Sequence, residues 1–324
     1  MRVLVRGAGV GGLTAAHELW TRGVGVELCE RASRVGAGAS GFAGGMLPPW
    51  CEREAASEPV LTLGRMAADW WEAALPGHVT RNGTLVVAPA RDASELVRFA
   101  ARTEGHAWLD QAGIAELEPA LAGRFRRGLF FPEEAHLDPR AALAALHCKL
   151  AEHGVNFHFG EENFSARGFD RVIECTGATA IGTMPGLRGV RGEMLYLETG
   201  EIALSRPVRL LHPRHPLYVV PRAGGRFMVG ATMIETDDAG PVSARSLMEL
   251  LNAAYALHPA FGEARVVETG AGVRPAYADN LPRVTQEGTT VHINGFHRNG
   301  FLLAPAMARQ AADLIAADQR ALSA

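Results

Sequence analysis

The chain has 324 residues, 48% of them hydrophobic, and its 32 basic and 35 acidic residues leave a net charge of −3. This length and apolar content allow two globular domains with sizeable cores and exclude an intrinsically disordered chain. The charges are interspersed and no apolar run approaches the length of a membrane span, so neither nucleic acid nor a membrane is an expected partner.

The four cysteines are Cys29, Cys51, Cys148 and Cys175, and none of them has CxxC or CxxH spacing. Scattered cysteines of this kind predict no metal site and are typical of reduced thiols in a reducing compartment. The first residues lead directly into a predicted strand without an apolar signal region, so the cytoplasm is the expected location.

Residues 1–31 have the pattern of a strand, a glycine turn, a helix and a second strand that ends in an acid. Gly7, Gly9 and Gly12 have GxGxxG spacing: the first permits the tight turn, the second lets the backbone approach a pyrophosphate, and the third lets helix and strand pack closely. Glu30 follows Gly12 by eighteen positions, where a carboxylate can bind ribose hydroxyls. This combination predicts a dinucleotide-binding unit.

The next segment, residues 31–50, is rich in Gly, Ala and Ser and is expected to form a loop that touches the nucleotide; the alternative is a plain linker. A single helix is predicted from Ser57 to Leu75. Three elements without visible chemistry then follow: a strand at 84–88, a helix capped by Asp92 and running to about Thr103, and a short helix at 111–117.

Asp138 and Pro139 indicate the start of a strong helix that runs to about His153. Strands are predicted at 155–159 and 169–178, and the second ends at Gly177 as if it met a ligand. From residue 192 the pattern changes to successive antiparallel strands. The expected elements there are strands at 192–198, 207–212, 217–222 and 226–233, a helix at 243–257, a strand from 265, a strand at 291–294, a loop at 295–300 and a helix at 301–317.

The order of these elements predicts an α/β nucleotide domain of the Rossmann type with an antiparallel-sheet domain of α+β character inserted into it. The nucleotide domain is expected to comprise residues 1–50, 132–186 and 268–324, and the substrate domain residues 51–131 and 187–267. A ligand would bind at their boundary, near the carboxyl ends of the strands.

Several segments resemble the D-amino acid oxidase and glycine oxidase family of FAD-dependent amine oxidases. They are GAGVGG with Glu30 and Arg31, GGMLPPWCE at 44–52, LYVVPRAGGRFMVGATM at 217–233, GVRPAYADNLP at 272–282 and GFHRNGFLLAP at 295–305. The chain is most similar to the glycine oxidase branch that serves thiamine biosynthesis. No cysteine lies near 272–282, where the sarcosine oxidase branch attaches flavin, so the resemblance implies non-covalent FAD.

Arg274 lies between apolar Val273 and Pro275, where a guanidinium needs a partner; that partner could be a substrate carboxylate or a structural salt bridge. The resemblance implies the substrate clamp. It also implies that Tyr218 donates a second hydrogen bond to the carboxylate and that Arg298 helps to hold the substrate. Met46 and Met233 would line the substrate pocket.

The resemblance implies a larger set of FAD-binding residues. These are Gly7, Gly9, Gly12, Glu30, Arg31, Ser40, Gly45, Met46, Gly177, His297, Arg298, Asn299, Gly300, Phe301 and Leu302. We interpret His297 as hydrogen-bonding scaffold, with proton transfer as the alternative. The helix that begins near Gly300 would direct its positive end toward the flavin.

The implied reaction is the oxidation of glycine, sarcosine and small D-amino acids to imines and 2-oxo acids, with oxygen reduced to hydrogen peroxide. The imine formed from glycine, iminoglycine, would be used in thiamine thiazole synthesis. The expected partners are the small amino acid and oxygen, and a homo-oligomer is compatible with the sequence. Alternatives are a D-amino acid oxidase or dehydrogenase for larger substrates, an NAD-dependent dehydrogenase, a flavin aromatic hydroxylase and a non-catalytic flavin-binding module.

Overall fold

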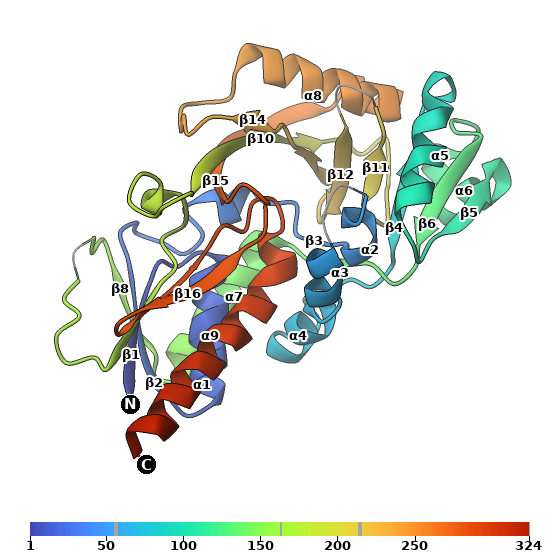
Figure 1. The fold of residues 1–324 in the computed structure, drawn as a ribbon. Helices are drawn as coiled ribbons and strands as arrows, with labels where there is room; N and C mark the ends of the chain where they lie inside the picture. The colour runs from blue at the N-terminus through green and yellow to red at the C-terminus, as the bar shows by residue number, and fades with distance from the viewer. Residues whose placement is uncertain (55–57, 163, 213–215, 324) are drawn as a thin grey trace.

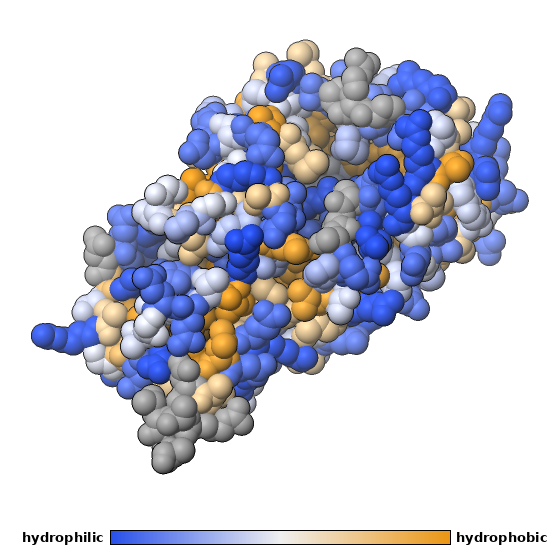
Figure 2. Space-filling model, in the orientation of Figure 1, coloured by the Kyte–Doolittle hydropathy of each residue, from blue (hydrophilic) through white to orange (hydrophobic). Residues whose placement is uncertain are grey.

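The computed structural model describes residues 1–54, 58–162, 164–212 and 216–323. Its two main sheets lie beside one another, and the N- and C-termini lie at the same end of the molecule (Figure 1). Hydrophilic residues cover most of the face shown in Figure 2, and apolar residues form smaller groups between them. The fold is a mixed α/β one, as the sequence predicts.

The first sheet has six strands in the order β16-β17-β9-β1-β2-β8. All neighbours are parallel except the edge strand β16, which runs antiparallel to β17. The strands are β1 (Arg2–Arg6), β2 (Gly25–Glu30), β8 (Asn156–Phe159), β9 (Arg171–Glu174), β16 (Arg283–Glu287) and β17 (Thr290–Asn294).

Three helices pack together beside this sheet: α1 (Val10–Thr21), α7 (Pro139–Glu152) and α9 (Gly300–Ser323) (Figure 1). Their apolar residues form one core with those of β1, β2 and β17. The short helices α3 (Glu58–Gly64) and α4 (Ala67–Ala74) pack against α9. The parallel order and the helix between β1 and β2 are those of a dinucleotide-binding fold.

The second sheet has nine strands in the order β14-β10-β13-β12-β11-β4-β6-β5, with β15 paired to β10. They are β4 (Thr84–Val87), β5 (Ala107–Asp110), β6 (Arg127–Phe131), β10 (Arg188–Glu198), β11 (Val208–Leu210), β12 (Leu217–Arg222), β13 (Arg226–Gly230), β14 (Ile234–Glu235) and β15 (Arg265–Ala276). The expected domain boundary at residue 268 falls inside β15, which pairs with β10 from end to end.

Side chains alternate between the two faces of the second sheet. Leu195 and Val219 belong to the core shared with helix α8 (Ala244–Leu257). Met194, Tyr218 and Val220 belong to a smaller cluster on the opposite face, which includes Met46. The helices α5 (Ala93–Arg102) and α6 (Gln111–Leu117) flank the strands β4 to β6 (Figure 1).

The segment between the sheets in sequence, residues 39–52, contains three short elements. These are η1 (Ala39–Phe42), β3 (Met46–Leu47) and α2 (Pro49–Glu52), and β3 pairs with β7 (Ala135–His136). The remaining 3-10 turns are η2 (Ala90–Asp92), η3 (Pro119–Leu121), η4 (Gly177–Ala180) and η5 (Pro259–Gly262). The glycine-rich segment therefore consists of short structured elements that lie between the two sheets.

Several predicted helices are confirmed together with their caps. Asp138 accepts hydrogen bonds from the N–H groups of Arg140 and Ala141 at the start of α7, and Ser243 caps α8 through the Ser246 N–H. Asp92 precedes α5 as predicted, but its side chain makes no capping hydrogen bond.

The single helix predicted from Ser57 to Leu75 is wrong, because α3 ends at Gly64 and α4 begins at Ala67. Gly64 packs so closely on Leu302 of α9 that a Cβ there would lie 2.9 Å from the leucine side chain. Glycine is a poor helix former, and this tertiary contact fixes the break. Ser57 itself lies outside the described residues. The sequence interpretation also missed β5, β6 and β16, and α9 extends beyond its predicted end at 317.

Candidate active site

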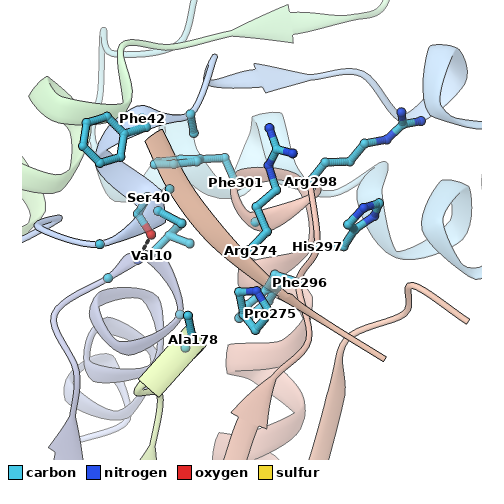
Figure 3. A pocket seen from close by; sticks show the side chains of 18 of the residues that line it. Val10, Ser40, Phe42, Ala178, Arg274, Pro275, Phe296, His297, Arg298 and Phe301 are labelled. Carbon is cyan, nitrogen blue, oxygen red and sulfur yellow. Dashed lines mark hydrogen bonds between the residues drawn. The ribbon is translucent and has the colours of Figure 1, made fainter. Parts of the chain in front are cut away.

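A cavity of about 530 Å³ lies where the two sheets meet. Its lining comes from the glycine turn after β1, the end of β2, residues 37–48, strands β12 and β15, and residues 293–302. Ser40 and Val10 lie on one side, and Arg274, His297 and Arg298 lie on the other (Figure 3). Segments far apart in sequence thus share one site at the carboxyl ends of the parallel strands, as expected.

The glycine turn has no room for side chains. Gly7 adopts φ +99°, and a Cβ there would lie 2.5 Å from the Cys175 carbonyl oxygen. A Cβ at Gly12 would lie 1.8 Å from the Gly7 oxygen, so α1 packs directly on the turn. Gly9 is the N-cap of α1, and Ser40 Oγ accepts the Val10 N–H at 3.1 Å (Figure 3). These contacts leave the first turn of α1 beside the cavity, where its N–H groups can bind an anion.

Glu30 binds the backbone of the same glycine turn through its side chain. Its carboxylate accepts the Ala8 N–H at 2.7 Å through Oε2 and the Ala32 N–H at 2.9 Å through Oε1. A carboxylate has about four lone-pair positions, so further donors can still bind it. Arg31 follows at the cavity wall. These two backbone hydrogen bonds therefore fix the Glu30 carboxylate, which the sequence predicts to bind ribose hydroxyls.

Gly45 and Gly177, which the sequence also predicts to contact the cofactor, line the cavity at turns of the backbone. Gly45 has φ +70°, and a Cβ there would lie 2.2 Å from the Leu137 oxygen. Gly177 has φ +61°, and its carbonyl accepts the Asn294 side-chain amide at 3.0 Å. Both positions need the left-handed conformation that glycine adopts without strain.

Residues 299–302 form the entry into α9. The Asn299 N–H donates to the Phe296 carbonyl, and a Cβ at Gly300 would lie 3.2 Å from Val10 of α1. Phe301 stacks on Trp71 and accepts its indole N–H at 2.9 Å. Leu302 is buried next to it. The N-terminus of α9 thus lines the same cavity as that of α1.

Arg274 lies on β15 and extends over Gly192, where a Cβ would lie 2.1 Å from its Nη2. Nη1 donates to the Thr232 carbonyl at 3.0 Å, and no carboxylate of a described residue forms an ion pair with this guanidinium. The desolvated surroundings lower its pKa, and the nearby charge of Arg298 adds to the effect. The structural salt bridge that the sequence left open is absent from the part of the chain that the structure describes.

Tyr218 lies on β12 opposite Gly230 of β13, and its ring packs on Gly44. Burial raises the pKa of its phenol, so the hydroxyl stays protonated and can donate a hydrogen bond. Met46 packs in the same cluster as Tyr218. Met233 lines the cavity but is 54% exposed, which places it at the mouth.

Arg298 has a partner that the sequence did not reveal. Its Nε donates to Glu52 Oε2 at 2.7 Å, and the Glu52 charge raises the pKa of the guanidinium. Arg298 points away from Arg274 in Figure 3. Glu52 is the last residue of the GGMLPPWCE segment and lines the cavity, so its place in that segment could have identified it as a site residue. Arg209, another lining residue, was also missed.

His297 is held in the left-handed region at φ +50°, and its N–H donates to the Pro275 carbonyl. Burial and the charges of Arg274, Arg298 and Arg188 lower the pKa of its imidazole to about 3. A group with so low a pKa is poorly matched to proton abstraction near neutral pH. This favours the scaffold interpretation.

Cys29 and Cys175 line the cavity, and burial raises the pKa of both thiols. Protonated thiols are weak nucleophiles. Cys51 is buried in a separate core and Cys148 is exposed. Among the described residues, no group of three or more His, Cys, Asp or Glu side chains is arranged to hold a metal ion.

Comparison with known proteins identifies relatives over nearly the whole chain. The family model described as "DAO: FAD dependent oxidoreductase" matches residues 2–314. The chain is 69% identical over 319 residues to the Rhizobium etli protein named "Putative thiamine biosynthesis oxidoreductase ThiO", with 98% of each chain covered. It is 28% identical to the glycine oxidase of Geobacillus kaustophilus, covering 97% of this chain and 92% of that protein. The crystal structure of that organism's glycine oxidase superposes with a TM-score of 0.82 at 26% identity, covering 97% and 94% of the two chains.

Proposed function

Because this chain belongs to the FAD dependent oxidoreductase family, we propose that it is an amino acid oxidase acting on glycine and other small amines. The chain is an FAD-dependent oxidoreductase of the glycine oxidase and ThiO type. The substrate, the acceptor and the site residues are the proposal.

The residues around the cavity fit FAD. Side chains are absent where the backbone of the glycine turn must approach a pyrophosphate, because Cβ atoms at Gly7 and Gly12 would collide with the backbone. The N-termini of α1 and α9 both border the cavity, and Glu30 is fixed at the end of β2. The six-stranded sheet and its helices would hold the cofactor, and the nine-stranded sheet would hold the substrate, following the predicted division of the chain into two domains.

FAD, when bound, supplies the acceptor for the two electrons and the hydrogen that leave the amine-bearing carbon. Arg274 would bind the substrate carboxylate through its unpaired Nη2, and Tyr218 would donate a second hydrogen bond. These two groups fix the orientation of the substrate, so that no side chain needs to move a proton from the carbon. The entry into α9 would place positive potential beside the cofactor.

The observation that carries the proposal is the Arg274 guanidinium, which faces the cavity without a carboxylate partner among the described residues. A cation in such surroundings is costly unless a ligand compensates its charge. With the carboxylate held there, the amine and any side chain share the remaining space. Glycine, sarcosine and small D-amino acids should therefore fit best, and their imine products would serve thiamine biosynthesis.

We also propose that oxygen is the acceptor, with hydrogen peroxide as product, and that the enzyme acts in the cytoplasm. Within the described residues, no helix is long and apolar enough to cross a bilayer. FAD should be held non-covalently, so acid precipitation should release the yellow colour into the supernatant. Colour that stays with the pellet would contradict this.

The decisive experiment compares specificity constants for glycine, sarcosine, D-alanine, L-alanine and D-phenylalanine by peroxide release. One methylene in an apolar pocket changes transition-state binding by only about 1–3 kcal/mol, so we expect a graded preference for small substrates. Faster turnover of D-phenylalanine than glycine would favour a D-amino acid oxidase for larger substrates. Activity on L-alanine would contradict the geometry. Failure of glycine to bleach the enzyme anaerobically would favour a non-catalytic flavin module.

A further inference from the structure

Arg209 is a second guanidinium on the wall of the cavity. It lies on β11 directly opposite Tyr218 of β12. Val208 and Leu210, on either side of it, belong to the core beneath α8. The alternation along the strand therefore turns Arg209 to the face that borders the cavity, where its side chain is 11% exposed.

Arg209 has no hydrogen bond to any residue that the structure describes. The nearest carboxylate oxygens are Glu52 Oε1 at 3.7 Å and Glu54 Oε2 at 3.8 Å, which are too far for hydrogen bonds. Arg206, on the preceding turn, instead donates to Glu118, Asn82, Leu117 and Ser205. No nitrogen of Arg209 is among the buried polar atoms without a hydrogen-bond partner, so its N–H donors are accessible from the cavity. Because a guanidinium has five such donors, Arg209 is equipped for a ligand.

The charges at this end of the cavity are unequal. The guanidinium groups of Arg209, Arg274 and Arg298 line it, and the carboxylates nearest to them are those of Glu52 and Glu54. Glu54 lies closer to the exposed Arg102, at 3.5 Å, than to Arg209. Glu52 is closest to Arg298, at 2.7 Å. A substrate carboxylate on Arg274 would leave Arg209 with two carboxylates at 3.7 and 3.8 Å and no hydrogen bond to either. The N–H donors of Arg209 therefore remain available to a second anion.

We propose that Arg209 forms a second anion subsite, which binds a second carboxylate on the substrate. The substrate class is a small amino acid that carries this carboxylate on its side chain or on its amine nitrogen. The inference rests on the proposed function, because Arg274 must hold the first carboxylate. It predicts that a dicarboxylate binds more tightly than its monoamide, which has the same shape but one charge fewer.

The test measures dissociation constants for two matched pairs of non-oxidisable ligands by titrating the flavin absorbance of the FAD-loaded enzyme. Succinate against succinamate represents the side-chain position, and diglycolate against diglycolamate represents the nitrogen position. One added charge-assisted hydrogen bond should make at least one dicarboxylate bind roughly tenfold more tightly than its monoamide. This readout needs no turnover, so it is independent of whether glycine is oxidised.

Arg209→Met should reduce the acid-to-amide ratio to about one, whereas Arg209→Lys should keep part of it. Arg209→Gln replaces the Met variant if that protein does not retain FAD. Arg102→Met is the matched control, because Arg102 is exposed and also pairs with Glu54 without lining the cavity; it should leave the ratio unchanged. Ratios near one in the wild-type enzyme, or a ratio that persists in Arg209→Met, would overturn the proposal. Failure to oxidise glycine would instead contradict the proposed function.

Discussion

Arg274 is the residue on which substrate binding is expected to depend most. Replacing it with Ala removes a charge-assisted clamp worth about 1.5–3 kcal/mol, so the apparent KM for glycine should rise roughly 10- to 150-fold. Flavin content should remain near that of the wild type, because the glycine turn and Glu30 lie elsewhere in the cavity. The measurement is steady-state kinetics together with the flavin-to-protein absorbance ratio.

A carboxylate inhibitor provides the control for this variant. Glycolate has no amine, so its affinity reports on the carboxylate site alone, and it should weaken in parallel with glycine. Arg274→Lys keeps a charge but loses the planar pair of donors, so we expect an intermediate effect. Unchanged glycolate binding in Arg274→Ala would remove Arg274 from the substrate site.

The pair formed by Glu52 and Arg298 predicts a stability effect at the same scale. Its side chains are 9% and 23% exposed, so Glu52→Gln would leave a largely desolvated guanidinium without its closest anion. Breaking a fully buried pair costs about 3–5 kcal/mol, and solvent in the cavity should reduce the loss to roughly 2–3 kcal/mol. Urea unfolding of the FAD-loaded enzyme measures it.

Asp69→Asn is the matched control for that measurement. Asp69 pairs with Arg81 at the surface, where it is 82% exposed, so its loss should change stability by less than about 1 kcal/mol. Equal effects of Glu52→Gln and Asp69→Asn would contradict a structural role for the Glu52 pair.

Individual site residues differ in how far the sequence could predict them. Arg274 has informative neighbours, since apolar residues on both sides imply a partner for its charge. Arg298 was expected as a substrate contact, but its closest partner lies 246 positions away in sequence. No local pattern encodes such a pairing. Arg209 was missed for the same reason, because only the strand register places it beside Tyr218.

Elements whose signals are local were predicted best. The β1–α1–β2 unit and α7 have their turn glycines, caps and apolar periods within a few residues, and the structure confirms them. The break between α3 and α4 depends on Leu302 of α9, which is remote in sequence. Strand β6 pairs with β4 and with the edge strand β5, so the identity of β5 and β6 also depends on partners that the local sequence does not show.

The contact between α1 and the turn after β1 yields a prediction at the element scale. A Cβ in Gly12→Ala would lie 1.8 Å from the Gly7 carbonyl oxygen, a backbone atom that cannot rotate away. Helix α1 would have to move off the turn and distort the pyrophosphate site. We expect the purified variant to contain little FAD and to melt at a lower temperature. Gly200→Ala is the control, because no atom lies within 4 Å of its added Cβ; equal FAD contents in the two variants would refute the close-packing role.

At the scale of the whole molecule, burial of histidines determines how stability should respond to acid. His17 lies between Trp20 and Trp70 with neither ring nitrogen hydrogen-bonded. Burial lowers the pKa of this imidazole from 6.5 to about 4; the charge of Lys149 lowers it further, and that of Glu18 opposes the change. His136, which is buried on β7, has its pKa lowered to about 4 for the same main reason.

The sign follows from which state binds more protons. Between pH 6.5 and 4 the unfolded chain is protonated at these histidines and the folded chain is not, so stability falls as the pH falls. A pKa lowered from 6.5 to about 4 corresponds to roughly 3 kcal/mol for His17 across this window. Glu134 has the opposite effect, because burial raises its pKa to about 7 and its contribution is lost as the pH rises from 4.5 to 7.

The difference in unfolding free energy between the wild type and a His17→Leu variant isolates the contribution of His17, because Glu134 and His136 are common to both proteins. Urea unfolding of the wild type and of His17→Leu should be compared at pH 7.5, 5.5 and 4.5. The difference at pH 7.5 measures the change in packing, because His17 is then neutral in both states of the wild type. On acidification the wild type should lose more stability than the variant, by about 1 kcal/mol at pH 5.5 and about 2 kcal/mol or more at pH 4.5. Parallel pH profiles would mean that the folded protein accommodates the charged imidazole, contrary to its enclosure by the two tryptophans.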